Sequence, residues 1–181
     1  MSELYAGEVC AVARALIGCV VRHGETTGVI VEAEAYHESE PACHAYVGRT
    51  PRTSTLFGPP GLAYVYRSYG VHAMLNAVAE PDGVGAAVLI RALEPIEGIE
   101  LMRARRGRER LEELCSGPGK LTQALGIELA HNRGDLRDGA VTISPGRVGL
   151  DIVTSRRIGI TKAVELPWRF TVAGSRFLSR R

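Results

Sequence analysis

The feature that most constrains the fold is an irregular order of short strand-like and helix-like segments. Strand-like patterns lie at 19–22, 29–36, 62–68, 71–78, 86–92, 140–144, 148–154 and 168–173. Helix-like patterns lie at 5–17, 94–107 and 116–125. A sheet of parallel strands needs strands that alternate regularly with helices. Because that alternation is missing, the order predicts an α+β fold rather than a doubly wound α/β sheet.

The start and end of the second helix follow from local signals. Glu94-Pro95-Ile96-Glu97 places a proline and two acids together, and both suit the first turn of a helix. The charged stretch that follows is interrupted by Gly107. We therefore expect a helix that begins at Glu94 and ends near Gly107.

Length and composition indicate one globular domain. The chain has 181 residues, of which 45% are hydrophobic and 23% charged, with a net charge of +2, as is usual for a globular protein. No repeat or low-complexity linker divides it, so we expect a single domain over residues 1–181. The polar stretch 37–61 is long for a connection, and it is therefore expected to be functional or locally structured.

Several classes of protein are disfavoured by what the sequence lacks. The stretch Ala11–Val21 is interrupted by Arg14, whereas a membrane span needs about 20 apolar residues. No basic segment precedes a hydrophobic run at the N-terminus, so we expect no secretory signal and a cytoplasmic location. Neither the four cysteines nor the five histidines show metal-binding spacing, so no metal site is expected. P-loop, G-x-G-x-x-G and G-x-S-x-G motifs are also absent, which disfavours nucleotide cofactors and serine hydrolases.

The strand at 29–36 carries two carboxylates. Because side chains alternate along a strand, we expect Ile30, Glu32, Glu34 and Tyr36 on one face and four small apolar residues on the other, inward face. One interpretation is a strand face exposed to solvent. The other is a carboxylate beside an aromatic ring, where it can act as a general base.

Residues 62–78 form a predicted hairpin with Tyr69 and Gly70 at its tip. Three of the six tyrosines, Tyr64, Tyr66 and Tyr69, lie within six positions. An aromatic side chain at a hairpin tip cannot be buried against its own strands. It is either covered by a neighbouring loop or available to insert between stacked bases.

Cationic residues at three places are candidates for phosphate binding. Arg91 ends an apolar run and either extends into solvent or faces a phosphate. Lys120 lies in the first turn of an expected helix, where a cation is unfavourable unless an anion binds there; an ordinary helix start is the alternative. The segment 147–181 contains eight cations and two acids. It is either a soluble arginine-rich segment or a basic surface that attracts phosphate.

Together these segments resemble the alkyladenine (3-methylpurine) DNA glycosylase family. The match runs in order from about residue 16 to residue 175. Its most specific pieces are Val31–Tyr36, Thr50–Arg52, Tyr64–Gly70 with Asn76, Leu89–Pro95 and Cys115–Leu121. The resemblance implies a single mixed domain with a curved antiparallel β-sheet, flanked by helices and with a protruding β-hairpin. It also implies that no cofactor is needed.

The resemblance assigns a role to each matching residue. Glu34 is expected to be the catalytic residue that activates the attacking water, and Arg91 is expected to lie close to that water. Four residues are expected to line the base pocket: Tyr36, His44, Tyr66 and Asn76. Tyr69 is expected to fill the gap that a flipped nucleotide leaves. Arg52 and Lys120 are expected to bind phosphate.

These roles predict a base-excision-repair enzyme that flips damaged purines out of double-stranded DNA and hydrolyses the N-glycosidic bond. The expected substrates are alkylated purines, hypoxanthine and etheno-adenine, and the expected form is a monomer near the bacterial nucleoid. A lyase needs an amine nucleophile, and Lys120 and Lys162 are the only lysines, so we expect no lyase activity. The alternatives are a non-catalytic lesion-binding protein with the same pocket and a hydrolase of free nucleosides.

Overall fold

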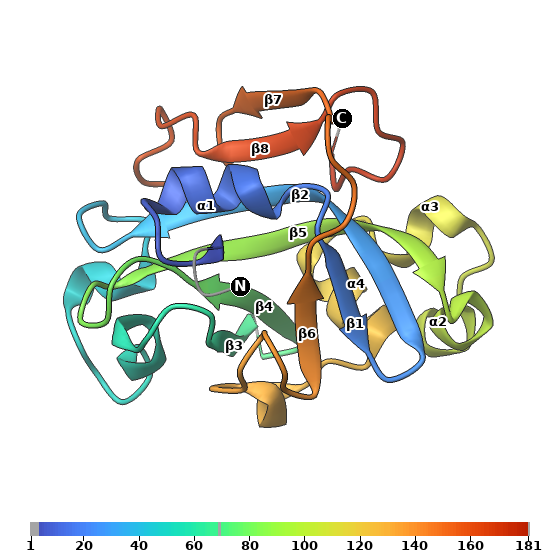
Figure 1. Ribbon diagram of the computed structural model, residues 1–181, viewed down its shortest axis with the longest axis horizontal. Coiled ribbons are helices and arrows are strands. Elements are labelled where there is room, and N and C mark those ends of the chain that lie inside the picture. Colours follow the sequence, from blue (N-terminus) through green and yellow to red (C-terminus); the bar gives the residue numbers. More distant parts are fainter. Residues whose placement is uncertain (1–3, 69, 181) are drawn as a thin grey trace.

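The computed structural model describes residues 4–68 and 70–180 (Figure 1). The strands are β1 (Val20–His23), β2 (Thr26–His37), β3 (Ala63–Ser68), β4 (His72–Val78), β5 (Ala86–Glu97), β6 (Val141–Ser144), β7 (Ile152–Ser155) and β8 (Arg169–Val172). The α-helices are α1 (Val9–Leu16), α2 (Ile99–Arg106), α3 (Leu111–Leu114) and α4 (Pro118–Leu125). The short 3₁₀ helices include η2 (His44–Val47), η3 (Ser54–Phe57) and η4 (Leu129–His131).

The strands form one antiparallel sheet. Their order is β3-β4-β5-β2-β1-β6, while β8 pairs with β2 and β7 pairs with β8. The sheet is strongly curved, since β1 and β6 run across the direction of β5 (Figure 1). Antiparallel strands with helices that do not alternate with them confirm the predicted α+β class. The predicted hairpin is also confirmed, because β3 and β4 pair from Ala63↔Ala77 to Ser68↔His72.

The main hydrophobic core contains buried residues of the sheet together with those of α1 and α4. The amphipathic α1 buries four apolar residues and packs on β2 and β5, whereas α4 packs on β4 and β5. Among residues 4–68 and 70–180, no helix has the length and apolar character that a bilayer span requires.

The pairing of β2 with β5 is irregular beside the two carboxylates of β2. Ile30 pairs with Leu93, Glu32 with Ala92 and Ala33 with Ile90, so the register shifts on both sides of Glu32. The predicted faces of β2 are therefore wrong for Ile30 and for Val31, which packs with Ala92 and Phe177 in a separate cluster. Ile30 lies in the main core with Ala33, whereas Glu32 lies outside that core. A β-bulge changes the direction in which the following side chains point. A prediction from strict alternation of side chains along the strand does not take such a bulge into account.

The helix predicted to begin at Glu94 is wrong, because β5 continues to Glu97. Pro95 pairs with Gly28 of β2, while β4 pairs with β5 only as far as Leu89. Proline is tolerated in a strand where a neighbouring strand is missing on one side. Gly98, with a φ of 70°, then turns the chain into α2.

The end of α2 follows the prediction. Gly107 has a φ of 60°, and its N–H donates to the Arg103 carbonyl. Glycine takes this left-handed conformation without the steric cost that a side chain adds. The helix therefore ends at Arg106, next to the predicted position.

The long connection 37–61 is locally structured, as predicted. It contains η2 and η3, and its apolar side chains form a second core with β3, β4 and β5. The members of that core are Cys43, Ala45, Leu56, Phe57, Tyr64, Val78 and Ala87. This packing holds η2, and with it His44, against the strands of the predicted hairpin.

Candidate active site

A cavity of about 600 Å³ brings most of the predicted site residues together. Its walls come from β2, β3, β4 and β5, the loop that contains η2 and η3, the start of α4, and the segments 158–160 and 179–180. The predicted residues that line it are Tyr36, His44, Arg52, Tyr66, Asn76, Arg91 and Lys120. Glu34 contacts Tyr36 and Arg91 from behind the cavity wall. Tyr69 lies outside the described residues.

Glu34 is a fully buried carboxylate with three hydrogen-bond donors. The Tyr36 hydroxyl donates to Oε2 at 2.8 Å, and Arg91 Nη1 donates to the same oxygen at 3.1 Å. The backbone N–H of Ile158 donates to Oε1 at 2.7 Å. Burial raises the pKa of Glu34, while the Arg91 charge and the three hydrogen bonds oppose that shift. A carboxylate with a raised pKa is a stronger base than an exposed one.

Arg91 is held by a second buried carboxylate, Glu32. Arg91 Nε lies 3.2 Å from Glu32 Oε1, and Arg169 Nε donates to the same oxygen at 2.8 Å. The backbone N–H and the hydroxyl of Ser179 also donate to Glu32, at 2.6 and 2.8 Å. Buried carboxylates and guanidinium groups need such partners, because an unpaired buried charge is costly. Glu32 therefore orients Arg91 toward Glu34 and attaches the C-terminal segment to the rim of the cavity.

Part of the cavity wall is aromatic. The Tyr64 and Tyr66 rings are stacked with centroids 5.3 Å apart, and the His44 ring meets Tyr66 edge-on at 4.6 Å. His44 Nδ1 lies 3.1 Å from the Tyr64 hydroxyl. Burial raises the pKa of Tyr66 to about 12, and burial together with the Arg52 charge lowers the pKa of His44. The wall is therefore uncharged near neutral pH and suited to stacking against a flat ring.

Asn76 contributes a polar group to this wall. Its amide nitrogen donates to the carbonyls of Tyr64 and Met74, at 3.0 and 3.4 Å. These bonds fix the orientation of the amide. Its oxygen, which forms no hydrogen bond within the part of the chain that the structure describes, is left as an acceptor.

Cations lie around the mouth of the cavity. Arg52 and Lys120 are exposed and line it, as does Arg180. Lys120 Nζ lies 3.5 Å from the Ser116 hydroxyl, just before α4. The positions of these charges suit a ligand with phosphate groups.

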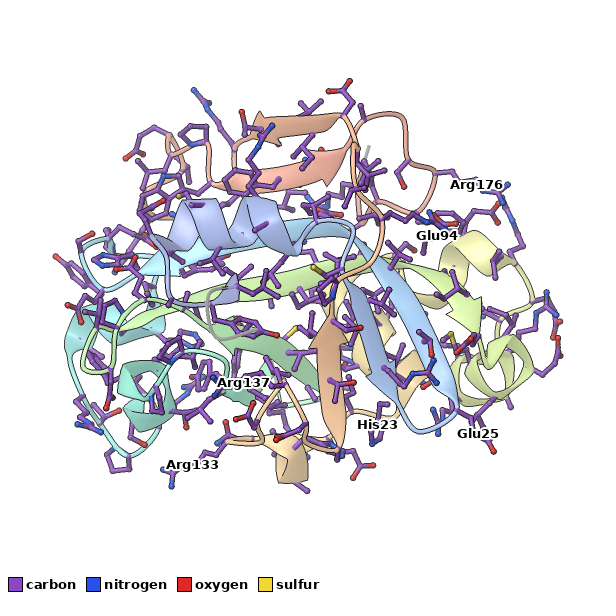
Figure 2. All side chains as sticks on the ribbon, in the orientation of Figure 1. His23, Glu25, Glu94, Arg133, Arg137 and Arg176 are labelled. Atoms are coloured by element: carbon purple, nitrogen blue, oxygen red, sulfur yellow. The ribbon has the colours of Figure 1, made fainter. Side chains whose placement is uncertain are left out.

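The basic segment 147–181 is less basic than its sequence indicates. Arg147 binds Glu94, Arg157 binds Glu40, Arg169 binds Glu32 and Arg176 binds Glu112. Figure 2 shows Glu94 and Arg176 at the end of the molecule where β5 leads into α2. Half of the eight cations are thus neutralised by acids from elsewhere in the chain. The interpretation of the whole segment as one phosphate-attracting surface is therefore wrong.

The sequence patterns do not predict the contribution of three residues in this region to the candidate site. Ile158 contributes through its backbone, so its side chain carries no signal. Ser179 lies 147 residues from its partner Glu32. Arg157 was counted as part of a basic surface, although its side chain is fully buried. Among residues 4–68 and 70–180, no three His, Cys, Asp or Glu side chains are grouped as metal ligands.

Comparison with known proteins gives consistent matches. The model of the family described as methylpurine-DNA glycosylase (MPG) matches residues 3–176. A protein of Bradyrhizobium diazoefficiens is 56% identical over 169 residues, which cover 93% of this chain and 84% of that protein. A protein of Methanoculleus marisnigri is 49% identical over 188 aligned positions, covering 99% of this chain and 98% of that protein. Both carry the name "Putative 3-methyladenine DNA glycosylase".

Proposed function

This chain belongs to the methylpurine-DNA glycosylase family, and we propose that it excises alkylated purines, hypoxanthine and etheno-adenine from double-stranded DNA by hydrolysing the N-glycosidic bond. The observation that carries the proposal is the fully buried Glu34 carboxylate behind an aromatic cavity. Arg91 and the Ile158 N–H bind that carboxylate directly. Removal of a base by water requires a carboxylate that can accept a proton, placed beside a pocket that accepts a flat ring.

The pocket would recognise the base by stacking and by one amide. Tyr36 and Tyr66 would contact the faces of the base, and an alkylated purine with a positive charge favours electron-rich rings. The oxygen of Asn76 would accept a hydrogen bond from the base. His44, held by Tyr64, would form the edge of the pocket.

A base inside a duplex cannot reach this cavity, so the nucleotide must be flipped, at a cost of a few kcal/mol. Tyr69, between Ser68 and Gly70 at the end of the β3–β4 hairpin, would occupy the space left in the duplex. Arg52 and Lys120 at the mouth of the cavity would bind phosphates on either side of the flipped nucleotide.

Bond cleavage would pass through a cationic sugar, as in glycoside hydrolysis generally. The Glu34 carboxylate would stabilise that cation and accept a proton from water, while Arg91 would orient the carboxylate. Neither oxygen of Glu34 needs a metal for this step. Lys120 is exposed at the mouth of the cavity rather than beside Glu34, which supports hydrolysis without a Schiff base.

The direct test is incubation of the protein with duplexes that carry one of these lesions. We expect release of the free base, no covalent adduct after borohydride treatment, and activity that falls with rising salt because phosphate contacts contribute. Tight binding without base release would indicate a non-catalytic lesion-binding protein. Release from free nucleosides at a rate insensitive to salt would indicate a nucleoside hydrolase. Either result would refute the proposal.

The pH dependence of base release should report the ionisation of Glu34. Only the carboxylate form accepts a proton, and burial raises its pKa. The rate is therefore expected to fall as the pH decreases, starting at a higher pH than for an ordinary glutamate. Single-turnover rates with a hypoxanthine duplex, a neutral base, would show this acidic limb.

Other groups near Glu34 must be separated from it. Tyr36 and Tyr66 do not titrate in the acidic range, because burial raises the pKa of both phenols. His44 does titrate there, so the profile is repeated with His44→Asn. An acidic limb that disappears in this variant would contradict the assignment to Glu34.

A further inference from the structure

Arg157 and Glu40 form a buried ion pair next to the candidate active site. Their side chains are 0% and 6% exposed, and the guanidinium binds both carboxylate oxygens, at 2.6 and 3.1 Å. Burial lowers the pKa of Arg157, but the hydrogen bonds and charge of Glu40 outweigh that effect and raise it. The pair joins two segments far apart in the chain, the loop after β2 and the loop after β7. The proposed chemistry assigns no role to either residue.

The guanidinium also contacts the strand that carries Glu34. Arg157 Nη1 donates to the Ala35 carbonyl at 3.0 Å, between Glu34 and Tyr36. Its central carbon lies 4.6 Å from the centre of the Tyr36 ring and 5.3 Å from the Trp168 ring. A planar guanidinium stacks on such rings. The Tyr36 ring, whose hydroxyl donates to Glu34, is thus held by Arg157.

The residue after Arg157 supplies another donor to Glu34. The backbone N–H of Ile158 donates to Oε1 of Glu34 at 2.7 Å. Arg157 Nη2 also donates to the Ala163 carbonyl at 3.3 Å, so the same side chain also holds the middle of its own loop. Two of the three donors to Glu34, the Tyr36 hydroxyl and the Ile158 N–H, therefore depend on the position of Arg157.

We propose that the buried Arg157–Glu40 pair positions the two neutral hydrogen-bond donors of Glu34 and thereby sets its basicity. The inference rests on the proposed function, in which Glu34 is the base. Both donors favour the charged form of Glu34. When their positions loosen, Glu34 binds its proton more tightly and is less often ready to accept one from water.

The test uses Arg157→Lys in the full chain. Lysine keeps the charge but lacks the planar fork that binds Glu40, the Ala35 carbonyl and the ring of Tyr36 together. We expect the single-turnover rate at neutral pH to fall by about tenfold or more, because placement errors near reacting groups are costly. The acidic limb should move to higher pH, while affinity for lesion-containing duplex should fall much less than the rate. Glu40→Gln, which keeps the shape but removes the charge, should shift the limb in the same direction.

The matched control is Arg147→Lys. Arg147 also binds both oxygens of its partner, Glu94, at 2.6 and 3.0 Å. Glu94 pairs with Val29, near the start of β2, whereas Tyr36 lies near its end. This variant should keep the rate and the pH profile of the parent protein. Thermal melts show whether each variant is folded. If Arg157→Lys does not fold, the rate and pH profile of Glu40→Gln test the inference instead.

The outcomes separate the inference from the proposed function. If the parent protein releases no base from a lesion-containing duplex, the proposed function fails. If Glu34→Gln retains base release, the assignment of Glu34 as the base fails, and the inference fails with it. If Glu34→Gln loses base release but a folded Arg157 or Glu40 variant keeps both the rate and the acidic limb, only the inference is overturned. Loss of DNA affinity in proportion to the rate would also overturn it, since it would indicate a general structural role.

Discussion

Replacing Glu34 with glutamine is expected to lower the single-turnover rate of base release by about 10²–10⁴-fold, the usual contribution of a general base. Glutamine has nearly the same shape and can still accept the hydrogen bond from Ile158, but it cannot take a proton from water. Affinity for a lesion-containing duplex should therefore remain close to that of the parent protein. Quench-flow or gel analysis of base release, with binding measured in parallel, gives both numbers.

Glu97→Gln is the control for this substitution. Glu97 lies on the neighbouring strand β5, is about half exposed and binds Arg22 at 2.7 Å. Its replacement should leave base release unchanged. If Glu34→Gln reduces binding and rate to the same degree, Glu34 supports the fold of the pocket and is not the catalytic residue.

Replacing Tyr66 with leucine should weaken binding of a flipped base. Stacking of a base on an aromatic ring contributes about 1–3 kcal/mol, which corresponds to a loss of about 5–150-fold in affinity. Leucine keeps most of the apolar volume beside Tyr64 and His44, so the strand pairing should persist. Dissociation constants are best measured in the Glu34→Gln background, where the lesion is not consumed.

Tyr46→Leu tests whether any tyrosine of this region has the same effect. Tyr46 lies in η2, two residues after His44, but its side chain is largely exposed and does not line the cavity. This variant should bind as the parent does. Equal losses in the two variants would show that Tyr66 does not contact the base.

Much of the secondary structure could be predicted from local patterns. The hairpin strands of 62–78, the helix before Gly126 and the end of α2 at Gly107 all follow from residues that are adjacent in the chain. The helix expected at Glu94 failed because its proline and acids also suit the end of a strand with one free edge. Which of the two forms depends on the partner strand β2, about 65 residues earlier in the chain.

The candidate site shows the same division. The resemblance to the glycosylase family implies that Glu34, Tyr36, Tyr66 and Asn76 belong to one site. The structure places Tyr36, Tyr66 and Asn76 on the wall of one cavity, with Glu34 bound to Tyr36. Their roles in base removal stay predictions until the experiments above are done. The pattern did not reveal that Arg91 bridges Glu32 and Glu34, because the bridge depends on an irregular register between two strands.

Local sequence therefore determined which chemical groups are present and predicted most of the strands and helices that carry them. The surroundings of Glu34 depend on the tertiary structure. Its hydrogen-bond donor Ile158 is 124 residues away in the sequence and lies next to it because β8 pairs with β2. The same packing buries Arg157 and pairs it with Glu40, so a residue that is a surface cation by composition lies in the interior. Contacts between distant segments depend on which strands pair and which side chains are buried. Neither can be predicted from the neighbouring residues in the sequence alone.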